Sequence, residues 1–437
     1  MEGIEDIYPL TPTQAGMVFH ALAHPRDGAY TGQVCFRLKG PVDAELMRET
    51  WNRVAARHAV LRSAILWEDL EEPLQVVHQD VEVPWEQFDW SDLPAGEQDI
   101  AFERFRAEDR SRGFELTLPP LMRLTFIQMG AQEYWLVWTS HHAIADGWSI
   151  SALLADMAAI YAGMDKGTDA ALPLAFPYNR YIAWLQSRDE SGAESYWRDR
   201  LAGFTEPLTL LTPRPSAFRA ETDTHSTTLA SLSAELTTAL KEACQNNRIS
   251  LFTLVQAAWG ILLGRYCDRD DVVFGVTSSG RPPELEGIET AVGLFLNTLP
   301  VRHRLLPKRS VADWLQDIQS DARGFLQHET TALPRVKEWS EISDGSPLFD
   351  TILVMTNYPK SYARASNGPG WSVANVDVED HSNYALALVI TPGARLELKL
   401  VHDTNVVSGD TARQILSDLE CLLDTLAREP GLELGQI

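Results

Sequence analysis

The stretch His141-His142-Ala143-Ile144-Ala145-Asp146-Gly147 constrains this chain more than any other. Before it, residues 134–140 are mostly aromatic or β-branched, as is typical of a strand. After it, from Ser149 onward, apolar residues recur at the spacing of a helix, and Ser149 is the expected N-cap. The sequence therefore predicts a strand–turn–helix unit with polar side chains in the turn, a setting where functional residues often lie.

The two adjacent histidines of this turn have different expected surroundings. Neighbouring side chains on an extended backbone point to opposite sides, so only one of His141 and His142 can face a given cavity. A neutral imidazole is well suited to taking up a proton near neutral pH. Gly147 allows a sharp turn or a close approach of the backbone. A single histidine is more often a packed core residue, but this pair followed by Asp146 and Gly147 is a more specific pattern.

The pattern His-His-x-x-x-Asp-Gly resembles the signature of condensation domains of nonribosomal peptide synthetases. It resembles more loosely the signature of chloramphenicol-acetyltransferase-like acyltransferases. Other stretches resemble further motifs of the condensation family, in the family's order along the chain. Because any single short motif can occur by chance, the ordered series supports the resemblance better than one motif does. The matching stretches are 8–17 with Phe19-His20, 57–62, 178–184, 279–282 with 292–300, the weaker 327–333, and 346–350 leading into 355–359.

Length and composition agree with a folded protein of more than one core. A chain of 437 residues can hold two cores, and 45% hydrophobic with 22% charged residues is typical of globular proteins. The net charge of −24 argues against nucleic acid and anionic membranes as partners. The scattered cysteines have neither metal-binding nor disulfide spacing, and they fit buried thiols in a reducing cytoplasm. They are Cys35, Cys244, Cys267 and Cys421.

Neither a leader nor a membrane span is expected. The first residues lack the basic and apolar parts of a signal peptide. The apolar stretch 251–263 is interrupted by Gln256 and ended by Arg265, so it is too short to cross a bilayer. We therefore expect a cytoplasmic protein.

The patterning predicts a mixed α/β (α/β or α+β) fold in two halves. The resemblance implies two chloramphenicol-acetyltransferase-like lobes that form a V-shaped pseudo-dimer with a tunnel between them. We expect an N-terminal lobe over 1–175 with the His-His-x-x-x-Asp-Gly motif. We expect a C-terminal lobe over 176–437, with a floor loop near 278–292 and a latch near 357–372. Expected strands are 34–38, 121–128, 272–277 and 395–400; expected helices are 44–58, 251–266 and 412–426; the expected linker is 173–177.

The resemblance also implies the chemistry. In the family, the donor is an aminoacyl or peptidyl thioester on the phosphopantetheine arm of a carrier protein, and the acceptor is an amine on a second carrier. Such an enzyme must position two tethered substrates and handle the ammonium proton. His142 matches the catalytic position, either as a general base or as a hydrogen-bonding anchor for the amine. The N–H of Gly147 would contact the developing oxyanion, unless Gly147 has only a steric role.

Other residues are expected to support this site. The resemblance implies that Asp146 pairs with Arg62 and holds the turn, because a buried carboxylate needs such a partner. His141 is expected to pack or hydrogen-bond behind the turn, and Asn297 and Thr298 to brace the tunnel floor. Neither a metal nor an intrinsic cofactor is expected, only the phosphopantetheine of the carriers. The residues expected along the substrate tunnel are Trp148, Ser149, Asn297 and Tyr358.

The subtype is implied by resemblance alone. Residues 10–17 resemble the subtype that takes a donor with a D-configured last residue and an L-configured acceptor, and 348–350 and 357–359 agree with it. Starter-type domains with fatty acyl donors, and free-standing acyltransferases of this fold, remain alternatives. The order Gly147-Trp148-Ser149 disfavours an epimerization domain, and the intact histidines exclude a heterocyclization domain. A non-enzymatic recruitment module would be expected to show a degraded signature.

Adenylation and carrier domains are not expected within this sequence. We therefore expect either a domain of a larger synthetase or a free-standing enzyme. The partners implied are the donor and acceptor peptidyl carrier protein domains and the adjacent adenylation domain of the same synthetase. An excised domain is expected to be a monomer.

Overall fold

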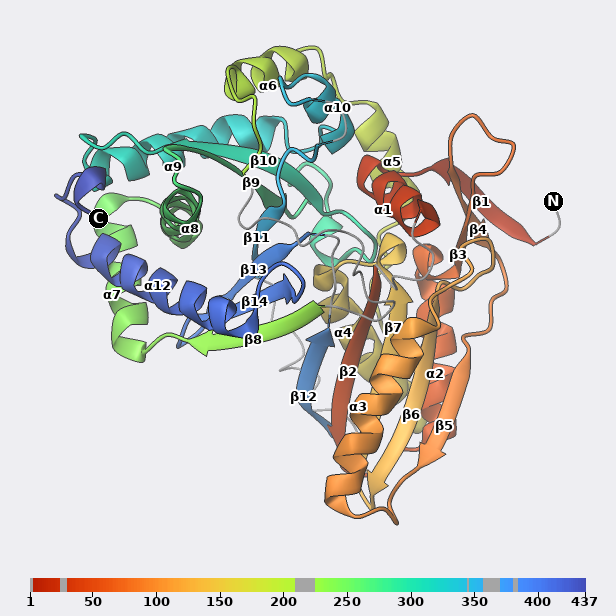
Figure 1. The fold of residues 1–437 in the computed structure, drawn as a ribbon. Helices are drawn as coiled ribbons and strands as arrows, with labels where there is room; N and C mark the ends of the chain where they lie inside the picture. Colours follow the sequence, from red (N-terminus) through yellow and green to blue (C-terminus); the bar gives the residue numbers. More distant parts are fainter. Residues whose placement is uncertain (1–2, 24–29, 209–224, 344–345, 357–369, 380–383) are drawn as a thin grey trace. The chain divides into compact units, whose positions relative to one another are not determined.

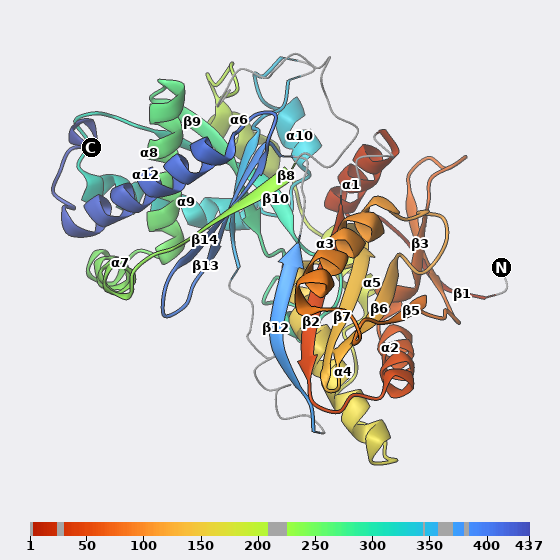
Figure 2. The same ribbon diagram turned by 60° about the horizontal axis from the view of Figure 1, so that its bottom comes forward.

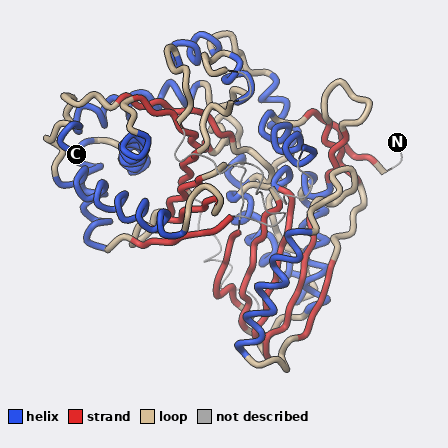
Figure 3. The backbone as a smooth tube through the Cα atoms, viewed as in Figure 1, coloured by secondary structure: helices blue, strands red, loops and turns tan. Residues whose placement is uncertain are grey.

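The computed structural model describes residues 3–23, 30–208, 225–343, 346–356, 370–379 and 384–437, and it forms two compact units. Both units combine helices with strands, which confirms the expected mixed α/β class (Figures 1 and 3). The predicted lobe boundary at residue 175 stays a prediction, but by compactness the first unit continues to Arg188. The first unit consists of Met1–Arg188, Arg281–Phe295 and Tyr358–Ser382, and the second of Asp189–Gly280, Leu296–Asn357 and Asn383–Ile437.

The first unit contains two sheets. The larger has five strands in the order β12–β2–β7–β6–β5, and the smaller has the order β1–β4–β3. The strands expected at 34–38 and 134–140 are confirmed within β2 and β7, and the one expected at 121–128 begins instead at Met122 of β6. The strands of this unit are β1 (Ile4–Pro9), β2 (Thr31–Lys39), β3 (Ser63–Leu66), β4 (Leu74–His78), β5 (Trp85–Asp89), β6 (Met122–Gly130), β7 (Glu133–His141) and β12 (Ser372–Glu379).

Helices cover both faces of the five-stranded sheet, α3 on one face and α2 with α4 on the other (Figures 1 and 2). The alternation of side chains along β2 explains this arrangement. Phe36 belongs to the large core beneath α2 and α4, whereas its neighbour Cys35 belongs to a smaller cluster beneath α3. Both faces of the sheet are therefore buried. The helices of this unit are α1 (Pro12–Ala23), α2 (Ala44–Arg57), α3 (Ala95–Ser111), α4 (Gly147–Asp165) and α5 (Tyr178–Gln186).

The second unit is built on a six-stranded sheet in the order β10–β9–β11–β13–β14–β8. Strand β11 runs parallel to β9 and β13, and the other neighbours are antiparallel. The strand expected at 272–277 lies within β9, and the one expected at 395–400 begins instead at Glu397. The strands are β8 (His225–Ser231), β9 (Asp271–Ser278), β10 (Asn297–Arg304), β11 (Thr351–Met355), β13 (Leu386–Thr391) and β14 (Glu397–Asp403).

The helices of the second unit pack on both faces of its sheet. One core joins the sheet to α7, α8, α9 and α12, and another joins its opposite face to α6 and α10. The helices expected at 251–266 and 412–426 are confirmed as α8 and α12. The helices are α6 (Ala193–Leu201), α7 (Ala234–Asn247), α8 (Leu251–Cys267), α9 (Val311–Gln327), α10 (Leu333–Glu338) and α12 (Gly409–Arg428).

Helix α8 is apolar because it lies inside this core, where Trp259 is fully buried. Within the described parts of the chain, no single helix meets the length and apolar content of a membrane span. Helices α7 and α8, which are bent by 105° relative to each other, meet these two criteria only when they are counted together, and only by length and composition.

Candidate active site

Strands β7 and β2 together position His142. We call residues 141–147 the signature turn; it begins at the last residue of β7, opposite Thr31 of β2. The backbone N–H of His142 donates to the carbonyl of Tyr30 at 2.8 Å. The His142 ring lies over Gly32, where a Cβ atom would be 3.0 Å from Nε2. A glycine at position 32 therefore leaves room for the ring, which remains partly exposed.

His141 points the other way and is only 3% exposed. Its Nδ1 accepts a hydrogen bond from the backbone N–H of Ala143 at 3.2 Å. Burial, and after it the nearby His142, lowers the pKa of His141 to about 3. The ring is therefore neutral at neutral pH, and its lone pair on Nδ1 supports the turn.

Asp146, the last residue of the signature turn before α4, is the N-cap of this helix. Its Oδ1 accepts hydrogen bonds from the backbone N–H of Ser149 at 2.9 Å and from the Ser149 hydroxyl at 2.8 Å. The prediction that Ser149 is the N-cap is therefore wrong: both residue types cap helices well, and here Asp146 caps a helix that begins at Gly147. Ser149 is fully buried, and its hydroxyl is occupied by this interaction.

Asp146 forms a buried ion pair with Arg281. Nη2 of Arg281 lies 3.0 Å from Oδ1 and 3.2 Å from Oδ2, and the two side chains are 4% and 0% exposed. The other guanidinium nitrogen, Nη1, donates to the carbonyls of Ile288 and Ala291 at 2.6 and 2.9 Å. The Phe295 ring centroid lies 4.2 Å from the guanidinium carbon. The buried charges thus have the partners that burial requires.

The expected ion pair between Asp146 and Arg62 is wrong. Arg62 pairs instead with Glu5 at 2.7 Å and donates to the carbonyls of Ala55 and Gln79 at 3.1 and 3.2 Å. Its guanidinium therefore joins the 3-10 turn after α2 to the small sheet of the first unit. The cation that pairs with the Asp146 carboxylate is Arg281, which lies much later in the chain.

Residues 281–295, which we call the bracing segment, make further contacts with the signature turn. The N–H of Asp146 donates to the carbonyl of Gly293 at 3.1 Å, and the N–H of Gly293 donates to the Ser149 hydroxyl at 3.1 Å. The indole N–H of Trp148 donates to the carbonyl of Glu289 at 2.7 Å. This segment includes most of the expected floor loop, and its polar backbone groups fix the start of α4.

Tyr178, at the start of α5, supports the bracing segment from behind. Its hydroxyl donates to the carbonyl of Leu294 at 2.6 Å. A Cβ atom at Gly293 would lie 2.4 Å from the Tyr178 ring, so only glycine fits there without displacing the ring. Burial raises the pKa of Tyr178 well above its ordinary value, so the hydroxyl remains a donor. The stretch 178–184, which resembled a family motif, therefore supports the turn through the bracing segment.

Gly147 is the first residue of α4 and is partly exposed. The first N–H groups of a helix have no acceptor within the helix, and the helix dipole favours negative charge at this end. The position therefore suits the stabilisation of an oxyanion.

Asn297 and Thr298 begin β10 in the second unit. The Asn297 amide donates to the carbonyls of Glu329 and Thr331 at 2.8 and 2.9 Å, and the residue is 9% exposed. The Thr298 hydroxyl lies 3.2 Å from that of Thr277. These contacts brace the residues around them. Tyr358 and most of the expected latch lie outside the described residues.

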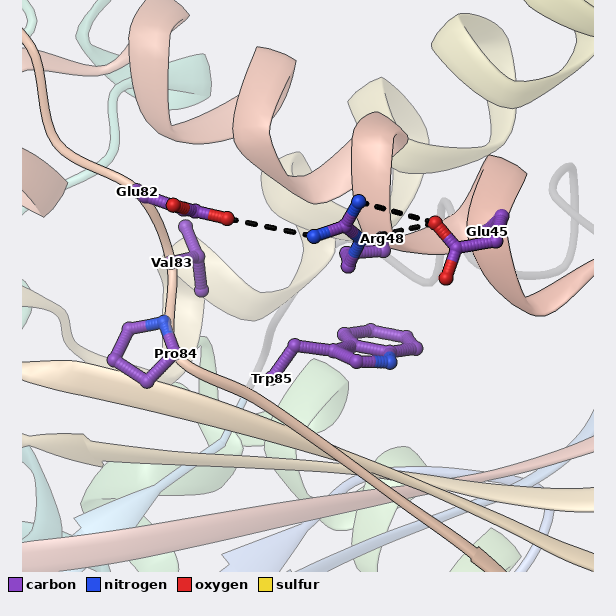
Figure 4. Close-up of a pocket in the computed structure, with 6 residues that line it drawn as sticks. All are labelled: Glu45, Arg48, Glu82, Val83, Pro84 and Trp85. Atoms are coloured by element: carbon purple, nitrogen blue, oxygen red, sulfur yellow. Dashed lines mark hydrogen bonds and ion pairs between the residues drawn. The ribbon is translucent and has the colours of Figure 1, made fainter.

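Other polar groups of the first unit form a pocket away from the signature turn. Figure 4 shows Arg48 of α2 between the carboxylates of Glu45 and Glu82, at 3.1 and 3.4 Å, above the ring of Trp85. The pocket has a volume of about 400 Å³ and is lined by α2 and residues 82–85. Among the described residues, no group of three or more His, Cys, Asp or Glu side chains could hold a metal ion.

Comparisons with known proteins agree with this architecture. The family model of the condensation domain matches residues 4–437. This chain belongs to the condensation domain family. A linear gramicidin synthase of Brevibacillus parabrevis is 38% identical to this condensation domain over 434 residues, covering 99% of the chain and 8% of that protein. The chain thus spans less than a tenth of the length of this relative.

Solved structures share the fold of this condensation domain. The first condensation domain of the calcium-dependent antibiotic synthetase, in complex with a substrate analogue, gives a TM-score of 0.79 at 19% identity, covering 99% of each chain. The X-domain from teicoplanin biosynthesis gives a TM-score of 0.81 at 23% identity, covering 98% of this chain and 97% of that one. At these identities the likeness concerns the fold alone.

Two side chains that contact the signature turn of this condensation domain, those of Arg281 and Gln14, were not predicted from the sequence. Arg281 neutralises Asp146, and the Gln14 amide donates to the carbonyl of Ala143 at 2.7 Å. Both lie in stretches that resembled family motifs, at 279–282 and 8–17. Their place in these stretches could have marked both residues as candidates, but it does not indicate which groups their side chains contact.

Proposed function

We propose that this condensation domain joins a carrier-bound aminoacyl or peptidyl thioester to a carrier-bound aminoacyl amine in nonribosomal peptide synthesis. The observation that supports this proposal most is that the polar side chains of the signature turn differ in burial. His141 and Asp146 are buried and bonded within the turn, whereas His142 is partly exposed at the end of β7. A thioester is already activated, so one positioned imidazole and good alignment of two substrates suffice.

The proposed step is acyl transfer from sulfur to nitrogen. The acceptor amine attacks the thioester carbonyl carbon and forms the C–N bond, and the tetrahedral intermediate then collapses with cleavage of the C–S bond. The phosphopantetheine thiol of the donor carrier leaves with a proton. His142 takes this proton from the ammonium nitrogen of the intermediate and passes it to the departing sulfur, or holds the amine by a hydrogen bond while the proton moves to the sulfur. The N–H of Gly147 stabilises the oxyanion.

The test is single-turnover amide formation with both carriers loaded. We expect His142→Ala to fold normally, because the ring is partly exposed, and to lose most activity. A loss of roughly 10²–10⁴-fold is typical of general acid–base catalysis, and a loss of only a few-fold would favour positioning. The matched control is His78→Ala, another partly exposed histidine of the first unit, which should keep full activity. Full activity of His142→Ala would refute the role.

We propose further that the donor ends in a D-configured residue. Residues 10–17 and 348–350 support this subtype by resemblance. Peptidyl thioesters that differ only in the chirality of the last residue should react at different rates, the D form faster. A steric misfit of the wrong hand gives roughly 10–200-fold discrimination. Equal rates, or a preference for the L form, would refute the subtype, and a preference for a fatty acyl donor would assign the domain to the starter type.

The proposed partners are the donor and acceptor carrier domains and an adjacent adenylation domain. The much greater length of the gramicidin synthase relative supports a place within a multidomain synthetase. The same loaded carriers separate the alternatives. A protein that binds them without forming an amide would be a recruitment module, and one that needs a soluble acyl-CoA would be a free-standing acyltransferase.

A further inference from the structure

We infer that Gln14 is a positioning residue for His142, acting through the carbonyl of Ala143. This inference rests on the proposed function, in which His142 acts on the acceptor amine. Gln14 lies in the first turn of α1 and is fully buried. It belongs to the first unit, as the signature turn does.

The hydrogen bonds of the Gln14 amide fix its orientation. Oε1 accepts from the backbone N–H of Thr11 at 2.8 Å, and Nε2 donates to the carbonyl of Ala143 at 2.7 Å and to Oε1 of Gln75 at 2.8 Å. A backbone N–H can only donate and a backbone carbonyl can only accept, so the two ends of the amide cannot be exchanged. The carbonyl of Ala143 therefore needs a donor at this position.

The bond to Gln14 restrains the peptide between Ala143 and Ile144, which is the next one along the chain after the peptide that follows His142. The N–H of Ala143 is held by Nδ1 of His141 and its carbonyl by Gln14, while the N–H of His142 is held by the carbonyl of Tyr30. The backbone is thus fixed on both sides of the His142 Cα atom. A displacement of about 1 Å in a reacting group can cost on the order of 10²-fold in rate. Loss of the Gln14 donor should therefore affect the rate of the chemical step.

The variant to examine is Gln14→Met, which keeps the length and apolar stem of the side chain and removes its hydrogen bonds. We expect the single-turnover rate constant at saturating donor and acceptor to fall roughly 10–100-fold, with little change in the half-saturating concentrations. The matched control is Gln33→Met. Gln33 is also fully buried, but its amide donates to Asp109 and Thr139 beneath α3. This control should lower the melting temperature and leave the rate of the folded protein unchanged.

A double variant separates positioning from a general structural role. If Gln14 acts through His142, adding Gln14→Met to His142→Ala should cause no further loss of rate. Two losses that multiply would overturn the inference, and so would a fully active Gln14→Met in an active parent domain. If Gln14→Met fails to fold, Gln14→Glu takes its place. It conserves the size of the side chain and, when ionised, cannot donate to Ala143.

A second measurement is independent of turnover. In protein labelled at histidine, the His142 ring resonances, assigned by their loss in His142→Ala, should shift in Gln14→Met and stay in place in Gln33→Met. Unshifted His142 resonances in Gln14→Met would overturn the inference. An inactive parent domain whose His142 resonances shift in Gln14→Met would refute the proposed function and leave the positioning by Gln14 standing.

Discussion

Two segments from the second half of the chain pack into the first unit, and they are held in different ways. The bracing segment, residues 281–295, is held by the buried pair of Arg281 with Asp146 and by backbone hydrogen bonds to the signature turn. Strand β12 is held by an antiparallel ladder along β2, and its Glu379 also pairs with Arg106 and Arg110. Glu379 is 25% exposed, whereas Asp146 is fully buried in its side chain.

The two segments should therefore differ in how strongly they affect the signature turn. The bracing segment contacts the same residues that shape the signature turn, so weakening it should disturb both stability and amide formation. The ladder of β12 uses backbone groups that nearly every residue supplies, and Arg106, with which Glu379 pairs, keeps Glu103 and Asp377 as further partners. Weakening β12 should therefore reduce stability without changing the geometry around His142. Three measurements test the contrast.

The largest effect is expected from Asp146→Ala. Removing one partner of a buried ion pair leaves the other charge uncompensated, at a cost of about 3–5 kcal/mol in the free energy of unfolding. Amide formation should be lost as well, because the bracing segment loses its anchor. Urea denaturation of Asp146→Ala, Arg281→Met and the double variant measures the coupling between the two residues. The parallel cycle with Arg62→Met is the control, and strong coupling to Arg62 instead of Arg281 would contradict the observed pairing.

An intermediate effect is expected from acid. His141 has a pKa of about 3 in the folded state and about 6.5 when unfolded, so below pH 6.5 the unfolded state binds more protons. Its contribution to stability is therefore complete above pH 6.5 and falls by about 1.4 kcal/mol per pH unit as the pH drops towards 3. His303 in β10, also buried, has its pKa lowered to about 3 and should add a similar slope.

The contribution of His141 to this pH dependence is measured by denaturation at pH 7, 6 and 5. It is the difference between the parent protein and His141→Gln in the slope of the free energy of unfolding against pH. The backbone groups of the β12 ladder do not titrate in this range, so acid should open the signature turn before it opens β12. Hydrogen exchange of the two regions at pH 5 checks this order, and earlier opening of β12 would contradict it.

The smallest effect is expected from Glu379→Gln. This change removes the charge of a carboxylate that is 25% exposed from Arg106 and Arg110, whose side chains are 7% and 15% exposed. Because Arg106 keeps Glu103 and Asp377 as partners, the cost should stay below the roughly 3–5 kcal/mol expected when a buried pair is broken. Amide formation should remain close to that of the parent, since the ladder remains in place. Hydrogen exchange along β2 should become slightly faster. A large loss of activity with unchanged stability would show that β12 affects the site directly.

Local parts of this architecture could be predicted from the sequence. Strand β7, the signature turn and helix α4 form one contiguous stretch, in which the strand is rich in aromatic and β-branched residues and the helix has apolar residues at helical spacing. The start of α4 was misplaced because Asp146 and Ser149 are both good N-cap residues. Only the observed bond from the Ser149 N–H to Asp146 decides between them.

Long-range partners could not be predicted in the same way. The cation for Asp146 comes from a residue 135 positions away, and the local pattern around Arg281 does not indicate its target. Strand β12 was not expected at all, because a register shift between Val373 and Asn375 interrupts the alternation of its apolar residues. Its partner β2 lies in the first tenth of the chain, and strand patterns specify which face is buried without specifying the neighbour.

The assembly of the first unit from three separate stretches has a consequence for synthesis on the ribosome. A ribosome adds about 5–20 residues per second, so roughly 7–27 seconds pass between Asp146 and its cation Arg281. During that interval the carboxylate of a nascent chain lacks the partner that permits its burial. A fragment cut after Arg188 would keep the histidines and lose both Arg281 and β12. The histidine motif is thus translated well before the residues that support it. Engineers who recombine such domains should therefore move residues 281–295 and 372–379 together with the motif.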